Sequence, residues 1–181
     1  MFSIKLRCLI FCLIFIIFSS TCFAFFTITL PFFDGKMIIC LAYIFIIPFA
    51  LWFGIAGCLS AYLGFFLGML MVGVEDLMMS ILWSLHAFWL ASIPLLAFRY
   101  FKADPELTTK KARIIFIVFG LFIGNLVCTA WGAILPVFFG FWPWSIVPVT
   151  WAYWMTGNLI LIGVFTPIIL HYLTIYIRRS S

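Results

Sequence analysis

The sequence predicts an all-α protein, a polytopic membrane bundle of about six transmembrane helices with both termini on the cytoplasmic side. Three observations lead to this prediction. Hydrophobic residues make up 67% of the 181-residue chain and charged residues only 8%, which is too few polar side chains to cover a water-soluble fold. The few charges separate long apolar runs. Nine of the ten Lys and Arg residues lie in three short clusters, as in a chain oriented by a membrane.

Four charge-free runs are long enough to cross a bilayer. A hydrocarbon core about 30 Å thick needs roughly 20 helical residues at about 1.5 Å each. Residues 8–33 therefore supply one span, residues 37–74 two, residues 77–98 one, and residues 114–177 two with a loop between them.

Glycine and proline mark the folding points inside the two long runs. Gly54 and Gly57 interrupt the first run. Four such residues interrupt the second run: Pro136, Gly140, Pro143 and Pro148. The predicted spans of this single transmembrane domain, residues 1–181, lie near 8–30, 37–53, 56–74, 77–98, 114–135 and 151–177.

The basic clusters predict the orientation. They lie at residues 5–7, 99–113 and 178–179, and an even number of spans places all three on one side. Basic residues accumulate on the cytoplasmic side, so that side holds both termini, and only Lys36 lies outside. We therefore expect a multi-pass protein of the plasma (cell inner) membrane.

The first span has a second interpretation. Lys5 and Arg7 are basic, residues 8–18 are apolar, and small residues lead up to Ala24, as in a secretory signal cleaved after Ala24. Apolar sequence resumes at Phe25 and continues to Phe33, which favours a full span instead. Cleavage would leave the orientation of the later spans unchanged.

Several function classes lack support in the sequence. The net charge of +5 is explained by membrane orientation, so we expect no nucleic-acid partner. The six cysteines include no C-x-x-C pair, which argues against a metal site. No G-x-S-x-G, H-E-x-x-H or P-loop motif is present. We expect neither catalytic residues nor a cofactor, and the chain is not predicted to be an enzyme.

Polar and aromatic residues within the last three spans predict a binding cavity. Such groups are costly in hydrocarbon and should face the bundle interior or a cavity. Trp83, His86 and Trp89 share one face of span four, and Trp151, Trp154 and Asn158 share one face of the last span. We expect the cavity to open outward and to bind a flat or cationic ligand by stacking and cation–π attraction.

The expected roof of this cavity is the loop of residues 136–150, with Phe141, Trp142 and Trp144. The expected solute-binding residues are five side chains within the spans and one carboxylate at the outer rim: His86, Asn125, Trp131, Trp154, Asn158 and Glu75. The alternative is that these amides and imidazoles only pack helices together, that the tryptophans only anchor the interface, and that Glu75 is only solvated.

A stripe of small residues follows one face of span three at a spacing of four: Ala56, Ser60, Gly64 and Gly68. This spacing allows close helix approach. It predicts either packing within the bundle or docking onto a partner membrane subunit.

Glycine placement carries a family resemblance. The patterns are Phe53-Gly54-x-Ala56-Gly57-x-x-x-Ala61-x-x-Gly64-x-x-x-Gly68, and Trp154-x-x-Gly157-Asn158-Leu159 followed by Pro167. With six spans in about 180 residues, the chain resembles the substrate-binding S component of energy-coupling-factor transporters. In that family the small-residue motif that docks the membrane partner lies in the first helix, whereas here the first span is rich in Phe and Ile.

The resemblance implies a membrane-embedded solute-binding subunit for micronutrient uptake. Its implied partners are the lipid bilayer, a small-molecule ligand, a transmembrane coupling subunit and ATPases. A second resemblance, carried by Trp151-x-x-Trp154-x-x-Gly157-Asn158 and Pro167, is to membrane-associated sensory domains. It implies a sensory module that signals through a separate output protein.

Overall fold

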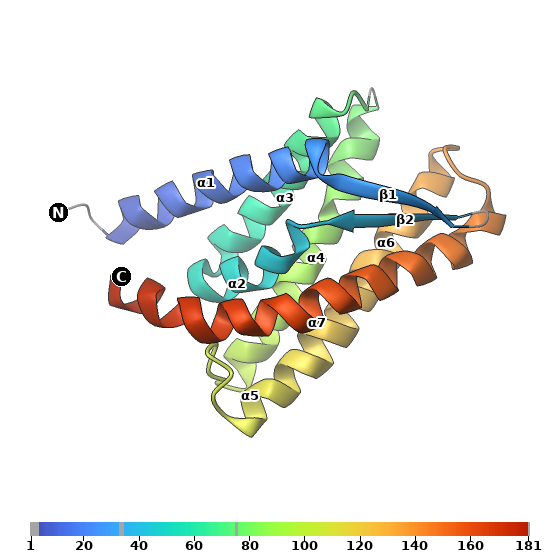
Figure 1. The fold of residues 1–181 in the computed structure, drawn as a ribbon. Coiled ribbons are helices and arrows are strands. Elements are labelled where there is room, and N and C mark those ends of the chain that lie inside the picture. The colour runs from blue at the N-terminus through green and yellow to red at the C-terminus, as the bar shows by residue number, and fades with distance from the viewer. Residues whose placement is uncertain (1–3, 33–34, 75, 181) are drawn as a thin grey trace.

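The computed structural model describes residues 4–32, 35–74 and 76–180, with side chains described for residues 6–27, 40–74 and 76–177. Over these ranges the chain is mainly helical, with one β-hairpin (Figure 1). The elements in chain order are α1 (Ile4–Phe25), β1 (Thr27–Phe32), β2 (Gly35–Cys40), α2 (Tyr43–Phe53), α3 (Ile55–Met71), α4 (Leu77–Tyr100), α5 (Lys110–Ile115), the π-helix η1 (Phe116–Gly124), α6 (Asn125–Phe138), the 3-10 helix η2 (Trp144–Ile146) and α7 (Val147–Ser180).

The predicted helical membrane architecture is confirmed at the level of helix length and composition. Four helical segments are long and apolar enough to cross a membrane: Leu6–Phe25, Leu77–Tyr100, Lys110–Phe138 and Trp144–Ile177. The other two apolar helices, α2 and α3, are shorter, with 11 and 17 residues. The outward surfaces of the long helices are apolar, as lipid contact requires. Ile17 on α1 is 66% exposed and Val164 on α7 is 52% exposed.

The region between the first two predicted spans differs from the prediction. Helix α1 ends at Phe25 rather than near residue 30, and α2 begins at Tyr43 rather than at residue 37. Strands β1 and β2 pair in antiparallel fashion between them, from Thr27↔Cys40 to Phe32↔Gly35. The physical reason is local, because Thr27, Ile28 and Thr29 in β1 and Ile38 and Ile39 in β2 are β-branched, which favours strands.

Helices α1 and α7 are inclined to α4 and α6 (Figure 1). The start of α1, the end of α7 and the loop of residues 101–109 lie toward one end of the bundle. The turn between α3 and α4 and the end of α6 lie toward the other end. The number of membrane crossings and their orientation stay predictions.

The small-residue stripe on α3 packs inside the bundle. A Cβ atom on Gly64 would overlap the Ser19 side chain of α1, and one on Gly68 would lie 2.8 Å from the Phe23 ring. Ser60 is buried, and its hydroxyl donates to the Ala56 carbonyl of the same helix. The stripe therefore lets α1 and α3 approach closely, so the packing interpretation holds for this part of α3.

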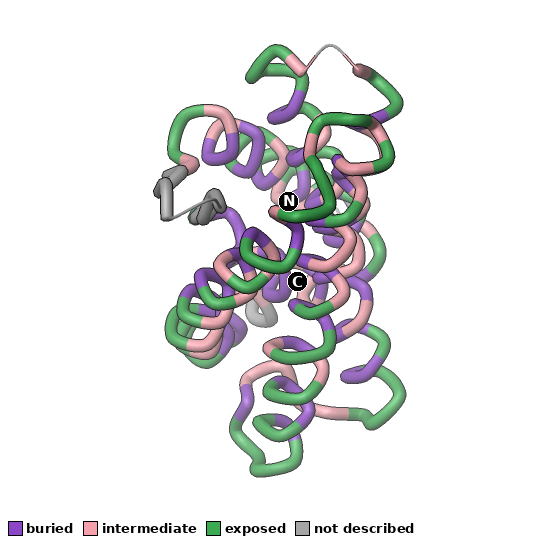
Figure 2. Tube along the Cα trace, turned by 90° about the vertical axis from the view of Figure 1, so that its right-hand side faces the viewer, coloured by how far each residue is buried: buried purple, intermediate pink, exposed green. Residues whose placement is uncertain are grey.

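The connection between α2 and α3 depends on glycine. Gly54 has a φ of +64°, which L side chains rarely adopt, and a Cβ there would lie 2.5 Å from the Arg99 guanidinium. Because Arg99 belongs to the last turn of α4, this connection lies at the end of the bundle that carries the basic loop. In Figure 2 buried residues follow the inner sides of the helices, and exposed residues follow their outer sides.

Candidate functional site

A pocket of about 420 Å³ opens at the end of the bundle opposite the basic loop. Its described lining comes from four helices, strand β1 and two connecting segments. The residues from α1, the hairpin and α3 are Phe23, Ala24, Thr27, Met69 and Val72. The residues from α4, α6 and the segments before and after them are Val74, Met79, Trp83, Pro136, Phe141 and Trp142. This volume lies within the range of small-molecule sites.

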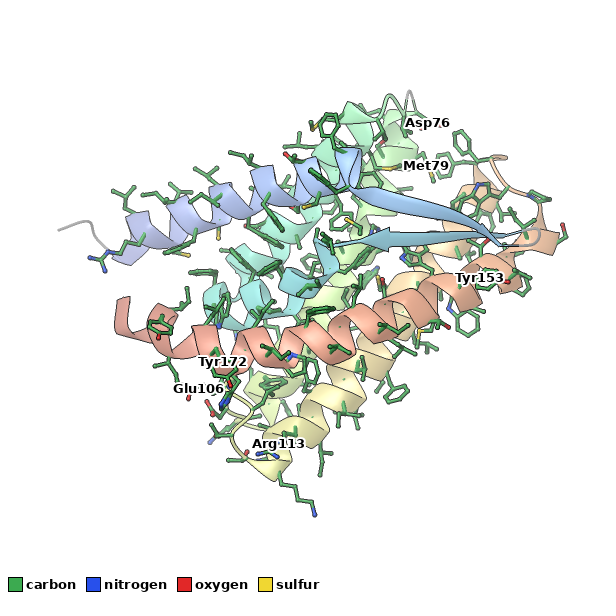
Figure 3. The ribbon with its side chains drawn as sticks, viewed as in Figure 1. Asp76, Met79, Glu106, Arg113, Tyr153 and Tyr172 are labelled. Atoms are coloured by element: carbon green, nitrogen blue, oxygen red, sulfur yellow. The ribbon has the colours of Figure 1, made fainter. Side chains whose placement is uncertain are left out.

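Local hydrogen bonds hold the pocket wall in place. The Thr27 hydroxyl donates to the Phe23 carbonyl at 2.6 Å, which fixes the hairpin against the last turn of α1. Asp76 is the N-cap of α4, and its carboxylate accepts from the Met79 backbone N–H at 2.8 Å. Figure 3 shows Asp76 and Met79 together at the start of α4, far from Glu106 and Arg113.

The loop after α6 folds back over the pocket. Gly140 has a φ of +74°, and the Phe141 N–H donates to the Pro136 carbonyl at 2.9 Å. This turn ends α6 in the manner of a glycine C-cap and brings Phe141 and Trp142 to the pocket. Phe141 and Trp142 were expected to roof a cavity between spans four, five and six, and they line this pocket instead. Trp144 is 59% exposed, lies against Phe138 and is not among the lining residues.

The described lining carries no charged side chain. It offers aromatic faces, two thioethers and aliphatic groups, while its one hydroxyl, on Thr27, already donates to the backbone. Such a wall suits a flat ring that is neutral or carries a delocalised positive charge, through stacking, sulfur–aromatic contacts and cation–π attraction.

Trp83 joins the pocket to the buried centre of the bundle. It lines the pocket, yet it is only 4% exposed, and its Nε1–H donates to the Gly132 carbonyl at 3.1 Å. Its ring stacks on Trp154 with 5.6 Å between centroids and lies 4.2 Å from the His86 ring. A Cβ on Gly132 would lie 2.5 Å from the Trp154 ring, so the small residue makes room for this stack.

His86 is fully buried, and both of its ring nitrogens have protein partners. Nδ1 lies 2.7 Å from the Trp83 carbonyl, and Nε2 lies 2.7 Å from the Tyr43 hydroxyl. A carbonyl can only accept, so Nδ1 carries the proton and donates. Nε2 then accepts from the Tyr43 O–H. The neutral imidazole is therefore satisfied by the protein and links α2 to α4.

Asn125 and Asn158 form a second buried link, between α6 and α7. The Asn158 amide N–H donates to the Asn125 Oδ1 at 3.0 Å, and the Asn125 amide donates to the Met155 carbonyl at 3.2 Å. Asn158 Oδ1 makes no hydrogen bond within the part of the chain that the structure describes. Both amides are fully buried.

The two remaining predicted tryptophans differ in their partners. The Trp131 Nε1–H donates to the Leu82 carbonyl at 2.7 Å, which ties α6 to α4. Trp154 is fully buried beneath Trp83. Glu75, the predicted rim carboxylate, lies outside the described residues.

The structure thus brings His86, Trp154 and Trp83 together, and separately pairs Asn125 with Asn158. None of the five described candidates lines the pocket, so their solute-binding role stays a prediction. The cavity was expected between spans four, five and six, but among described residues α7 contributes nothing to its lining, whereas α1 and α3 do.

Sequence reasoning missed the contributions of Phe23, Ala24, Met69, Val72 and Met79. These are apolar residues in apolar spans, and polarity gives no signal for them. The β-branched residues Thr27, Ile28 and Thr29 were the available indication, because such residues favour a strand, and β1 begins where α1 ends early.

Within the described ranges, no three His, Cys, Asp or Glu side chains gather as metal ligands would. Comparisons of the chain with protein-family models, curated proteins and solved structures gave no match. The pocket and the network beneath it are therefore the basis for assigning a function.

Proposed function

We propose that this protein is a membrane-embedded solute-binding subunit for micronutrient uptake. The observation that carries the proposal is the aromatic pocket of about 420 Å³ at the end of the bundle opposite the basic loop. A protein that captures solute from outside the cell needs such a pocket on the side away from its cytoplasmic positive charges.

The proposed topology has six crossings of the plasma membrane, with both termini in the cytoplasm. The second crossing consists of β2 and α2, which rise about 20 Å and about 16 Å respectively. Non-helical backbone at membrane depth is tolerated where protein covers it. Two contacts cover part of the hairpin in this way, since β1 pairs with β2 and β2 packs along α7.

The proposed ligand is a flat ring system, neutral or with delocalised positive charge. Trp83 forms the floor of the pocket, while Phe23, Phe141 and Trp142 supply further aromatic surface. A carboxylate or phosphate ligand is disfavoured, because the described wall offers it no cationic side chain.

Energy for uptake would come from separate subunits, because the sequence contains no nucleotide-binding motif. We propose a transmembrane coupling subunit with ATPases as these partners. With the α3 stripe covered by α1, their docking would use another face of the bundle.

Replacing Trp142 with alanine is the test of ligand capture, because this side chain lines the pocket without belonging to the buried network. We expect mass spectrometry of the purified wild-type protein to find a co-purified aromatic metabolite. Trp142→Ala should retain about tenfold less of it. Stacking of a flat ring on one aromatic side chain contributes about 1–3 kcal/mol to binding, and the variant removes one such side chain.

Trp144→Ala is the matched control, two residues away and outside the pocket lining. It should retain the metabolite at the wild-type level. Equal losses of the metabolite in both variants would contradict uptake. A wild-type protein that holds no metabolite and captures a kinase or cyclase would also contradict uptake, and it would support the sensory interpretation.

A further inference from the structure

A second hollow lies at the opposite end of the bundle from the solute pocket. It has a volume of about 470 Å³ and lies between the end of α4 and the start of the long segment Lys110–Phe138. Its apolar surface is made by Phe101, Ile114, Val118 and Phe119. We call these residues, with the stems of Lys110 and Lys111, the basic groove.

In the proposed topology, the basic groove lies at the membrane–water interface. Its lining extends from Lys110 to Val118, a rise of about 12 Å along the helix. The two lysines are exposed at the start of α5, and Val118 is 38% exposed on a segment long enough to cross the membrane. The groove therefore faces outward from the bundle, toward lipid.

The floor of the groove is built from ring packing. Phe101 follows α4, and its ring lies 5.8 Å from that of Phe119 in η1. The η1 segment is a nine-residue π-helix between α5 and α6, and π-helical turns occur frequently at functional positions. Ile114 and Ile115 of α5 and Val118 and Phe119 of η1 line one hollow.

The charge around the groove is positive. Residues 99–113 contain five Lys and Arg and two carboxylates, Asp104 and Glu106. Neither carboxylate lines the groove. Asp104 accepts from the Thr108 hydroxyl at 2.8 Å. Arg113 is engaged within the loop, where its guanidinium donates to the Leu107 and Thr108 carbonyls.

We propose that the basic groove binds an anionic phospholipid of the cytoplasmic leaflet, with its phosphate at Lys110 and Lys111 and an acyl chain against Ile114, Val118 and Phe119. The shape and charge together select this occupant. A soluble anion gains nothing from the apolar floor, and an uncharged lipid gains nothing from paired lysines. The proposal is independent of the solute that the outer pocket takes.

The test compares two lipids on the full-length protein in detergent. Added phosphatidylglycerol should raise the melting temperature and remain bound in native mass spectra, whereas phosphatidylcholine should do neither. The variant Lys110→Gln/Lys111→Gln should bind phosphatidylglycerol about thirtyfold more weakly, since each lysine near an anionic surface contributes about fivefold.

Lys102→Asn is the control, because it removes a positive charge from the same basic cluster but outside the groove, and asparagine tolerates its φ of +50°. It should keep lipid affinity within about twofold of wild type. Val118→Trp fills the groove without changing charge and should also abolish retention. Equal responses to both lipids, an unaffected lysine variant, or an equal loss in Lys102→Asn would overturn the proposal.

Discussion

Replacing Gly64 with valine is expected to lower the free energy of unfolding by about 3 kcal/mol, through overpacking between α1 and α3. A side chain at this position would overlap Ser19 and would also lie 3.2 Å from the Ile16 carbonyl. Ser19 cannot move aside easily, because its hydroxyl donates to the Phe15 carbonyl at 2.6 Å. The two helices must separate instead. This effect is measured by heating the protein in detergent and monitoring the loss of its monodisperse peak in size-exclusion chromatography.

Gly163→Val is the matched control on α7. The nearest atom to a Cβ there is the end of the Leu121 side chain at 3.4 Å, an ordinary contact with a movable group. We expect a melting temperature close to that of wild type. Equal destabilisation by the two valines would show that α1 and α3 do not approach as closely as the structure has them.

Replacing His86 with alanine is expected to destabilise the protein by about 2–3 kcal/mol. The change removes hydrogen bonds to Tyr43 and to the Trp83 carbonyl, leaving the Tyr43 hydroxyl without its acceptor in a buried site. It also removes the ring that lies against Trp83 and Trp154. Ligand retention should fall as well, because Trp83 is the pocket floor.

The chain offers a matched control in its one other histidine. His171 is exposed on α7, and its contact with the Glu106 carbonyl is long, at 3.3 Å. His171→Ala should leave thermal stability unchanged, and Tyr43→Phe should reproduce only part of the His86→Ala loss. A His86→Ala protein as stable as wild type would show that this buried link is dispensable.

Most of the helices could be predicted from the sequence because they coincide with long runs that carry few charges. Span four, for example, was predicted at 77–98, and α4 is Leu77–Tyr100. The hairpin was not predicted, since the apolar stretches 28–33 and 37–40 adjoin the apolar helices and hydrophobicity alone does not separate a buried strand from a helix. The β-branched residues Thr27, Ile28 and Thr29 held part of that information.

The buried polar groups were correctly placed inside the bundle, but their partners came from distant segments. Tyr43 lies 43 residues before His86, and Asn125 lies 33 residues before Asn158. The spacing of residues within one span cannot show that polar side chains of different spans form hydrogen bonds with one another. The pocket wall was harder to predict. Residues such as Met69 and Ala24 are apolar like their neighbours in the sequence, and only the folded arrangement of α1 and α3 brings them to one pocket.

The central claim is that the aromatic pocket opens outside the cell while the basic loop remains inside. Single cysteines at Phe141 and Thr108 test it, because both positions are exposed and lie at opposite ends of the bundle. Of the native cysteines, Cys12, Cys22, Cys40, Cys58 and Cys128 are buried, and the wild-type protein measures the background that remains. With a membrane-impermeant maleimide on intact cells, Phe141→Cys should react and Thr108→Cys should react only after permeabilisation. Labelling of Thr108→Cys in intact cells, with Phe141→Cys protected, would contradict the account.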